Sequence, residues 1–496
     1  MSVQVLPSRV PAVVDRQLFW PIIASAILVS GPLRVDVRAQ AELKTTAVLQ
    51  KEYAEIDTRF RRQLSEIGPG GWRPNRSATG SLLFLVPDEF SPDGAKSTGR
   101  GPITAHRATH SGALFILAKQ AAEAGELSLA FQWATEALRE NPDHAEARRV
   151  LGYEQRDGKW LTEYGLRMSE SRQPKVWHPK FGWIGSTEAA RYDAGERLVG
   201  TRWVSAKDDA ARRTRMEDGW SLRTDHFLVR TNHSLEAAAQ LAARLERLHQ
   251  IWRQLFAGYY LSDREVRELF AGRRPPRRQR QPMRVFYHRN KSEYVAALAK
   301  RQPRIAETLG IYFAAEEEAH FFANDDNGNT SQNLSTLCHE AVHQLFQESR
   351  PSSRNIGALA NFWIIEGVAT YFESLTEHHD EQAGLYYTIG EAAAGRLPAA
   401  RERVLKDGFY VPLAQLTQWG KDDLQRQPEL AKLYSQSAGL TAFLMDAEGG
   451  HYRERLVRYL TDIYAGRDDA RTLATASGVS YEELDVAYRR FLERLP

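Results

Sequence analysis

The chain has 496 residues, of which 42% are hydrophobic and 26% are charged, and its formal net charge is +3. This length is enough for sizeable hydrophobic cores and predicts two or three domains in an ordinary globular protein. The small excess of positive charge gives no indication of nucleic-acid binding, and the sequence lacks the several long apolar segments of a multispan membrane protein.

Residues 1–39 have the features of a secretory signal peptide. Arg9 and Arg16 precede an apolar run at 18–29 that is too short to span a membrane comfortably, and Ala39 is a small residue at a plausible cleavage site. No cysteine lies near that site, so a lipoprotein is not expected. We predict a secreted or periplasmic protein without a stable membrane span; an uncleaved membrane anchor and a buried helix are the alternatives.

Residues 106–165 are predicted to be helical. A helix that contains residues 113–118, a turn at Gly125 and a second helix that ends at Asn141-Pro142-Asp143 resemble a tetratricopeptide-type repeat, and Ala145 opens a third helix. Such repeats need stacked neighbours, and the sequence contains little more than one and a half copies. A small helical bundle packed on the rest of the chain is the preferred interpretation, and a repeat that binds a protein partner is the alternative.

Two other stretches have no sustained period. Residues 40–105 are an N-terminal region without an assignment, and residues 166–220, rich in Trp, Arg, Gly and Lys, are interpreted as a connecting region. The densest basic run, at 273–280, contains two prolines and is predicted to be a solvated loop between a helix and a strand.

Residues 221–496 are predicted to form an α+β domain. A strand at 225–230 precedes a long helix capped by Ser234, and a strand at 283–287 is followed by a hairpin over residues 310–323. Two helices that carry a metal-binding motif and a helical tail complete the domain. The fold class is therefore a mixed sheet with an active-site helix and a helical C-terminal lobe.

The motif His339-Glu340-Ala341-Val342-His343 lies in the first of these helices. At the α-helical repeat the two histidines fall on one face, where both imidazoles can reach one Zn²⁺, and Glu340 lies beside them. The opposite face is an apolar stripe that packs into a core. It consists of Leu334, Leu337, Cys338, Ala341, Val342 and Leu345, with Phe346 at its margin. Cys338, the only cysteine of the chain, is therefore predicted to be a buried small hydrophobe rather than a ligand.

Glu366 is the candidate third ligand. It follows the apolar run Phe362-Trp363-Ile364-Ile365, and a carboxylate in such a position is costly to bury unless it is paired or bound to a metal. A surface ion pair is the alternative for Glu366 alone. Together with the two histidines, it predicts a zinc site with three protein ligands, which leaves a fourth position for water.

This combination resembles the gluzincin zinc metallopeptidases, in which the helix after His-Glu-x-x-His supplies a glutamate as third ligand. The sequence motif from Trp363 to Glu373 is similar to that of the peptidase MA-like superfamily, which includes poorly characterised secreted members. The metzincin signature is excluded, because Phe346 and Ser349 stand at its last two fixed positions. The resemblance implies a zincin-like catalytic domain, a Zn²⁺ cofactor and a peptide or protein substrate.

Catalytic roles follow from the chemistry and from the resemblance. Glu340 is expected to be the general base that takes a proton from water and passes it to the leaving amine. Tyr434 resembles the tyrosine that some gluzincins use to stabilise the oxyanion, and packing beneath the site is the alternative. Thr370, one turn after Glu366, is a candidate for holding a ligand in place. His320 of the hairpin is a candidate cleft residue, but a half-buried strand residue is the preferred interpretation.

The sequence differs from one group of related enzymes in a second motif. Zinc aminopeptidases with a similar Glu-Gly-x-Ala-x-Tyr motif also carry Gly-x-Met-Glu-Asn, whose glutamate holds the substrate amino terminus. This chain has no Gly-x-Met-Glu-Asn motif. Neither endopeptidase nor exopeptidase activity is therefore assigned. A non-catalytic zinc-binding or scaffold protein, whose partner binds through residues 106–165, is the alternative function; retention of Glu340 beside the three candidate ligands favours the peptidase.

Overall fold

The computed structural model describes residues 37–67, 74, 79–88, 90, 102–273, 281–323, 330–380, 384–467 and 469–496. Nearly all of the predicted signal peptide lies outside these residues, as does most of the basic run at 273–280. In the part that is described, no helix combines the length and the apolar character that a membrane crossing requires.

Helices and several small sheets make up an α+β fold, as the sequence predicts. The largest sheet has five strands in the order β11-β12-β10-β9-β8. These are β8 (Trp220–Arg223), β9 (Phe227–Thr231), β10 (Met283–His288), β11 (Gly310–Phe313) and β12 (Glu318–Phe322). The three central strands run parallel, whereas β8 and β11 are antiparallel to their neighbours and form the two edges.

The order of elements around this sheet agrees with the sequence prediction. The side chain of Ser234 accepts a hydrogen bond from the backbone N–H of Ala237 and so caps α8 (Leu235–Leu255). Strand β10 follows, and α11 (Lys291–Leu298) leads to the predicted hairpin of β11 and β12. Among the residues that the structure describes, no strand pairs with the outer edge of β11, because the hairpin ends the sheet.

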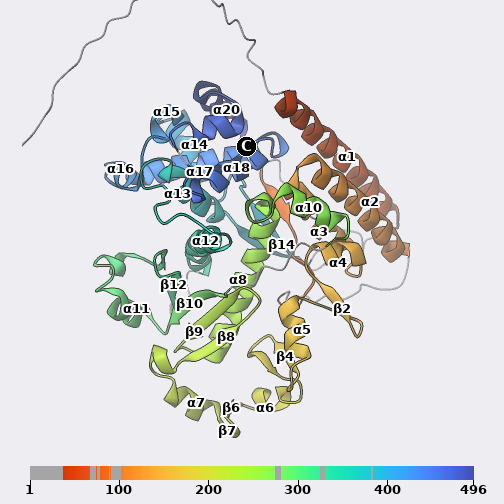
Figure 1. The fold of residues 1–496 in the computed structure, drawn as a ribbon, viewed down its shortest axis with the longest axis vertical. Helices are drawn as coiled ribbons and strands as arrows, with labels where there is room; N and C mark the ends of the chain where they lie inside the picture. The colour runs from red at the N-terminus through yellow and green to blue at the C-terminus, as the bar shows by residue number, and fades with distance from the viewer. Residues whose placement is uncertain are drawn as a thin grey trace, which may run out of the picture. The chain divides into compact units, whose positions relative to one another are not determined.

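Helix α12 (Thr330–Glu348) packs on β11, β12 and α8 (Figure 1). The apolar stripe predicted for this helix is buried: Cys338 is 2% exposed, and Ala341 and Val342 have no exposed surface. Burial raises the pKa of the Cys338 thiol to about 12, so this cysteine is an inert core residue, as predicted. The histidines of the motif lie outside the buried stripe.

Helix α13 (Phe362–Phe372) follows α12 and packs against α17 (Leu430–Asp446). Gly367 lies at the closest approach of these two helices, because a Cβ atom there would be 2.5 Å from Thr441 Oγ1 and 3.1 Å from the Ser437 carbonyl oxygen. The two helices meet tightly enough to require glycine at this position. This contact fixes the position of α13 along α17, and so it also positions Glu366, the residue before Gly367.

Helices α14, α18 and α20 pack on α17, and α16 packs on α13, with the C-terminal helices gathered at one end of the molecule (Figure 1). Strands β1, β14 and β13 form an antiparallel sheet in that order. The elements are β1 (Ser81–Leu83), β13 (Thr376–Asp380), β14 (Gly384–Ile389), α14 (Leu397–Leu405), α15 (Leu413–Leu416), α16 (Lys421–Gln425), α18 (Arg453–Tyr464), α19 (Thr472–Ser477) and α20 (Tyr481–Arg494).

The N-terminal helices form a second core. Helices α2 (Pro102–Ala124) and α3 (Leu127–Glu140) pack against each other, and α1 (Val37–Ile67) adds Tyr53, whose ring stacks on Trp133 of α3. The helix that Ala145 opens is α4 (Ala145–Val150), and α9 (Ala257–Tyr260) and α10 (Asp263–Phe270) complete this layer. Helix α3 also packs on α8, where the Ser128 hydroxyl donates to the Leu255 carbonyl.

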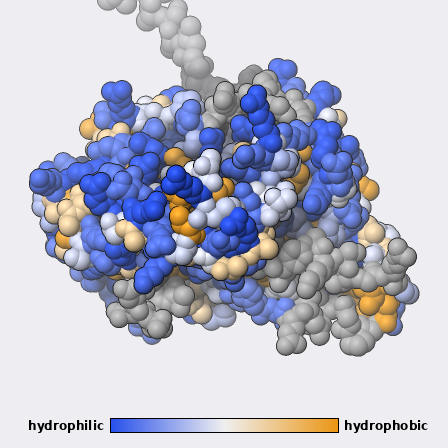
Figure 2. Space-filling view, turned by 90° about the horizontal axis from the view of Figure 1, so that it is seen from below, coloured by the Kyte–Doolittle hydropathy of each residue, from blue (hydrophilic) through white to orange (hydrophobic). Residues whose placement is uncertain are grey.

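Residues 154–161, at the end of the stretch predicted to be helical, instead form a β-hairpin, and the predicted connecting region over 166–220 contains two more hairpins. The three hairpins follow one another, and each leads into a short helix. They are β2 (Glu154–Arg156), β3 (Lys159–Leu161) and α5 (Glu163–Ser169); β4 (Lys175–His178), β5 (Gly182–Gly185) and α6 (Ala189–Asp193); and β6 (Glu196–Val199), β7 (Arg202–Ser205) and α7 (Ala206–Arg212). The second strand of each carries a tryptophan. Seen from this end, the surface is mostly hydrophilic, and hydrophobic residues appear only in small patches (Figure 2).

Candidate metal centre

Helices α12 and α13 bring together the three residues that the sequence predicts as metal ligands. Nε2 of His339 lies 3.3 Å from Nε2 of His343, and Oε2 of Glu366 lies 3.5 Å and 3.8 Å from these two nitrogens. The three side chains keep between 13% and 18% of their surface accessible. The donors thus form a small triangle that one ion can reach.

The size of this triangle fits a zinc ion. With Zn–N bonds of about 2.0–2.1 Å, two donors of a tetrahedral site stand about 3.3 Å apart. The two imidazole nitrogens match that separation, and the carboxylate oxygen of Glu366 is a few tenths of an ångström further away. Two histidines and one carboxylate are also a donor set that catalytic zinc sites use.

A second carboxylate, that of Glu373, contacts the ring nitrogen of His339 that is not part of the donor triangle. Glu373 Oε1 lies 3.0 Å from His339 Nδ1, and the carboxylate of Glu373 accepts two hydrogen bonds from the Arg396 guanidinium, at 2.7 Å and 3.1 Å. When Nδ1 donates to a carboxylate, Nε2 keeps its lone pair for a metal. Neither Glu373 nor Arg396 is among the site residues predicted from the sequence. The spacing from Glu366 to Glu373, two helical turns, was the available signal for Glu373.

The charges of these groups are matched to one another. Burial alone would lower the pKa of His339, but its hydrogen bonds with Glu366 and Glu373 outweigh burial and raise that pKa to about 10. Burial lowers the pKa of His343, more than Glu366 raises it. Although burial would raise the pKa of Glu366, the two histidines hold it below its ordinary value. The carboxylate is therefore ionised and opposite the imidazoles, as a cation ligand must be.

Glu340 faces the edge strand of the sheet. Its Oε2 accepts a hydrogen bond of 3.0 Å from the backbone N–H of Tyr312 on β11. Because this N–H points away from β12, Tyr312 and Ala319 form a non-hydrogen-bonded pair of the antiparallel ladder. Gly310, two residues earlier, directs its backbone groups to the same free edge. The unpaired edge of β11 therefore runs beside the candidate general base.

Tyr434 reaches the same region from α17. The Arg396 guanidinium lies over its ring, 5.8 Å from the centroid. The pKa of the phenol is raised well above its ordinary value, chiefly by burial and then by the negative charge of Glu366. The hydroxyl is therefore protonated at neutral pH and can donate a hydrogen bond.

Two other residues singled out in the sequence have different surroundings. The Thr370 hydroxyl donates to the backbone carbonyls of Glu366 and Gly367, at 2.7 Å and 3.0 Å, so these hydrogen bonds are with the helix backbone rather than with the ligand carboxylate. His320 is buried: its Nδ1 lies 3.2 Å from His288 Nε2, and its ring stacks on Phe286.

The sequence matches no protein-family model and no curated protein. What the molecule does must therefore be inferred from its own residues. At the junction of α12, α13 and α17 these are three convergent donors, a carboxylate beside them, an ion pair that orients one ligand, and a protonated phenol.

Proposed function

We propose that this protein is a zinc-dependent peptidase with a gluzincin-type site in a zincin-like domain. His339, His343 and Glu366 would hold Zn²⁺. The observation that carries the proposal is the convergence of their donor atoms, between 3.3 Å and 3.8 Å apart, with His339 oriented by Glu373. Two histidines on an ordinary surface helix have no reason to converge on a carboxylate of the next helix.

When bound, Zn²⁺ supplies Lewis-acid chemistry that polarises a peptide carbonyl and makes a water molecule more acidic. Glu340 lies next to the first ligand in sequence and is the base of the reaction. It takes the proton of the attacking water and delivers that proton to the leaving amine, so the amine departs neutral. The hydrogen bond from Tyr312 N–H holds the Glu340 carboxylate in place.

Tyr434 is proposed as the donor that stabilises the developing oxyanion. Its phenol stays protonated because burial and the nearby Glu366 raise its pKa. A protonated hydroxyl can donate where negative charge develops, and such donors are usually a large contribution to catalysis. The cation of Arg396 over its ring would hold the side chain in this position.

The substrate is proposed to be an extended peptide that adds to the free edge of β11. On this edge the backbone groups of Gly310 and the carbonyl of Tyr312 are suited to pairing with a peptide main chain, while the N–H of Tyr312 is bonded to Glu340. A peptide held there would pass beside Glu340. We also propose that the protein acts outside the cytoplasm, on the features of residues 1–39, and that the helices over residues 106–165 offer a surface to a protein partner.

The test compares the wild type with Glu340→Gln. Zinc content is measured by elemental analysis, and cleavage of a mixed peptide library is followed by mass spectrometry. We expect the variant to retain zinc and to cleave about 10²- to 10⁴-fold more slowly, because the amide cannot accept the proton. Glu402→Gln, which removes an exposed partner of Lys406 on α14, is the control.

Two other outcomes would contradict the zinc assignment or the peptidase activity. A wild type that binds no zinc contradicts the metal assignment. A wild type that binds zinc but cleaves nothing in the library supports the non-catalytic alternative. The product sequences of an active protein would also establish its side-chain preference and whether a free terminus is required.

A further inference from the structure

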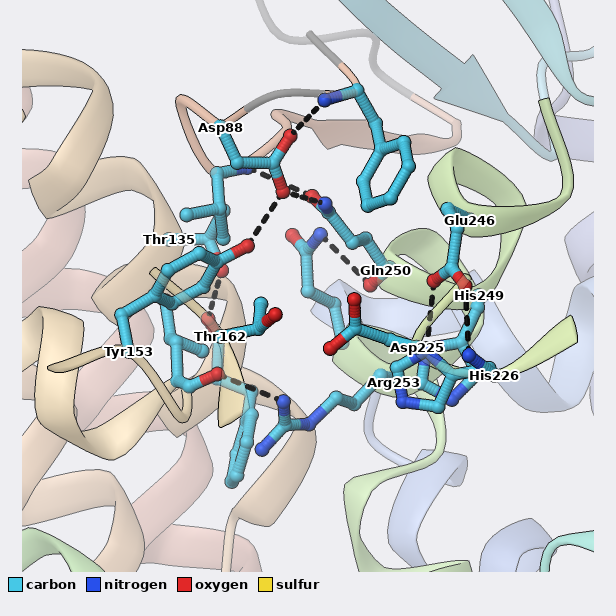
Figure 3. Close-up of a pocket in the computed structure, with 15 residues that line it drawn as sticks. Asp88, Thr135, Tyr153, Thr162, Asp225, His226, Glu246, His249, Gln250 and Arg253 are labelled. Carbon is cyan, nitrogen blue, oxygen red and sulfur yellow. Dashed lines mark hydrogen bonds and ion pairs between the residues drawn. The ribbon is translucent and has the colours of Figure 1, made fainter. Parts of the chain in front are cut away.

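A second group of histidine and carboxylate side chains lies at the start of β9 and on α8. His226 directly precedes β9, and Glu246 and His249 stand one turn apart on α8. One donor atom from each of the three lies within 4.8 Å of the others. Figure 3 shows the three side chains on one wall of a cavity, with Asp225 beside them. The sequence analysis did not identify this group.

Within the group, Glu246 and His226 are paired. Oε1 of Glu246 accepts the backbone N–H of His226 at 2.8 Å, and Oε2 lies 2.7 Å from His226 Nδ1. The ring of His249 stacks on that of His226, with centroids 3.6 Å apart. Glu246 is 2% exposed and His249 is 9% exposed, whereas the His226 side chain keeps 39% of its surface accessible. An ion can therefore approach through His226.

The cavity contains a polar atom without a partner. Asp225 Oδ2 has no exposed surface and no hydrogen-bond partner, although a buried carboxylate oxygen normally has one. The cavity that Asp225 lines has a volume of about 50 Å³, which is enough for a metal ion with bound water. An ion there would meet an acceptor that the protein itself leaves unsatisfied.

The charges around the cavity favour a divalent cation. On the wall in question, Asp225 and Glu246 supply two carboxylates, and the two imidazoles are neutral when they act as ligands. Across the cavity the carboxylate of Asp88 offsets the guanidinium of Arg253. Two negative charges thus remain for an ion of charge two.

We infer that this cavity is a second metal site, which binds a divalent transition-metal ion such as Zn²⁺ through His226, Glu246 and His249, with the carboxylate of Asp225 beside them on the cavity wall. The ion takes the place of the proton shared by His226 and Glu246, and that proton passes to solvent. Its role is structural, because its three ligands join α8 to the residue that precedes β9. It would tie the start of β9 to α8, beside Tyr153 and Thr162 of the hairpin region.

The experiment counts metal ions in the full chain. Wild type, His343→Gln, His249→Gln and the double variant are stripped with a chelator, reloaded with ZnCl₂ and dialysed. We expect about two, one, one and zero zinc equivalents per chain, respectively, from two independent sites. His379→Gln, at an exposed histidine of β13, is the control and should retain about two. His226→Gln serves as a second variant in case His249→Gln does not fold, because His226 keeps 39% of its side-chain surface accessible.

The four proteins separate this inference from the proposed peptidase. If the wild type binds about one zinc that only His343→Gln loses, the second site is overturned and the peptidase centre stands. If it binds about one that only His249→Gln loses, the second site stands and the peptidase centre fails. Reloading with Co²⁺ adds a spectroscopic check, because His249→Gln and His226→Gln should each remove part of the visible absorption. Unchanged absorption in both variants contradicts the inference.

Discussion

Two regions of the described chain combine two histidines with one glutamate, and they arrange these donors differently. On α12 and α13 the donors are held apart: two nitrogens and one oxygen face a common point at 3.3–3.8 Å, and Glu373 orients His339 from outside. At α8 and β9 the glutamate instead contacts its histidine directly, at 2.7 Å.

The two sites differ in how much their side chains must rearrange before an ion can bind. The α12–α13 centre is preorganised, because the supports of His339 lie outside the triangle and an ion enters with little movement. Both groups release a proton when an ion binds, because the pKa of His339 is raised to about 10 without metal, but the α8 group must also give up the direct hydrogen bond between His226 and Glu246. A catalytic ion needs the first arrangement, while the second arrangement also stabilises the fold when no metal is bound.

The same substitution at the two glutamates should therefore be seen in different measurements. Glu366→Gln replaces a charged ligand by a weak one, and we expect loss of zinc from the centre and at least about 10²-fold slower peptide cleavage. Glu246→Gln removes the charged partner of His226, and we expect the free energy of unfolding, measured by urea titration in EDTA, to fall by about 1–3 kcal/mol. Wild-type cleavage rates in Glu366→Gln would remove the basis for treating the two regions differently.

Glu373 tests the preorganisation directly. Glu373→Gln leaves all three ligands in place but replaces the carboxylate that orients His339. We expect zinc affinity, measured by competition with a chelator, to fall about 10- to 100-fold. Glu377→Gln is the matched control, since that carboxylate pairs with Tyr387 and His379 rather than with His339. Equal affinities in the two variants would mean that the packing of α12 and α13 is sufficient to orient His339.

The α12–α13 centre could be predicted because it depends on local periodicity. The helical repeat places His339 and His343 on one face, and the apolar run before Glu366 indicates a buried carboxylate. The same periodicity, applied to Glu373, would have found the support of His339. Arg396 and the N–H of Tyr312 could not be found in this way, because their contacts depend on how distant elements pack.

The α8 group and the hairpins were missed for other reasons. Glu246 and His249 lie among Leu245, Leu248 and Trp252, and polar residues in an apolar stripe are a signal that the sequence analysis passed over. Their partner, His226, comes from another element, which no local pattern reveals. The hairpins at 154–205 have strands of only three or four residues, too short for an alternating pattern to be recognised.

The cavity beside α8 should also make stability depend on pH. Burial raises the pKa of Asp88 to about 6, against the hydrogen bonds that it accepts from Tyr153, Phe90 N–H and Gln250. The pKa is higher in the folded state than in the unfolded state, so the stabilisation is fully present below about pH 4 and is lost as the pH rises through about 6. We expect the free energy of unfolding in EDTA to fall by about 2 kcal/mol over this interval from this group.

Asp88→Asn, which cannot titrate, should show a flatter pH profile. Urea titrations at pH 4.5 and 7.5 measure the difference for both proteins. If the wild type and Asp88→Asn lose the same amount of stability between the two values, Asp88 is not the group responsible. EDTA excludes a contribution from bound metal, and the ionisable residues of the α12–α13 centre are the same in both proteins, so the difference between the two profiles reports Asp88.

Two glycines provide the smallest and most local test of how firmly the centre is held. Gly367→Ala would place a Cβ atom 2.5 Å from Thr441 Oγ1, so α13 must move away from α17, and we expect a loss of about 1–2 kcal/mol in the free energy of unfolding. Gly112, inside α2, has no atom within 4 Å of an added Cβ, and Gly112→Ala should stabilise by about 0.5–1 kcal/mol.

Both alanine variants are measured by urea titration, together with their zinc affinity. Because Glu366 directly precedes Gly367, a shift of α13 moves one corner of the donor triangle relative to the two histidines on α12. Zinc affinity should therefore fall in Gly367→Ala and stay at the wild-type value in Gly112→Ala. A Gly367→Ala protein that loses stability but binds zinc as the wild type does would show that the ligands adjust to one another, and the α12–α13 centre would then be no more preorganised than the α8 group.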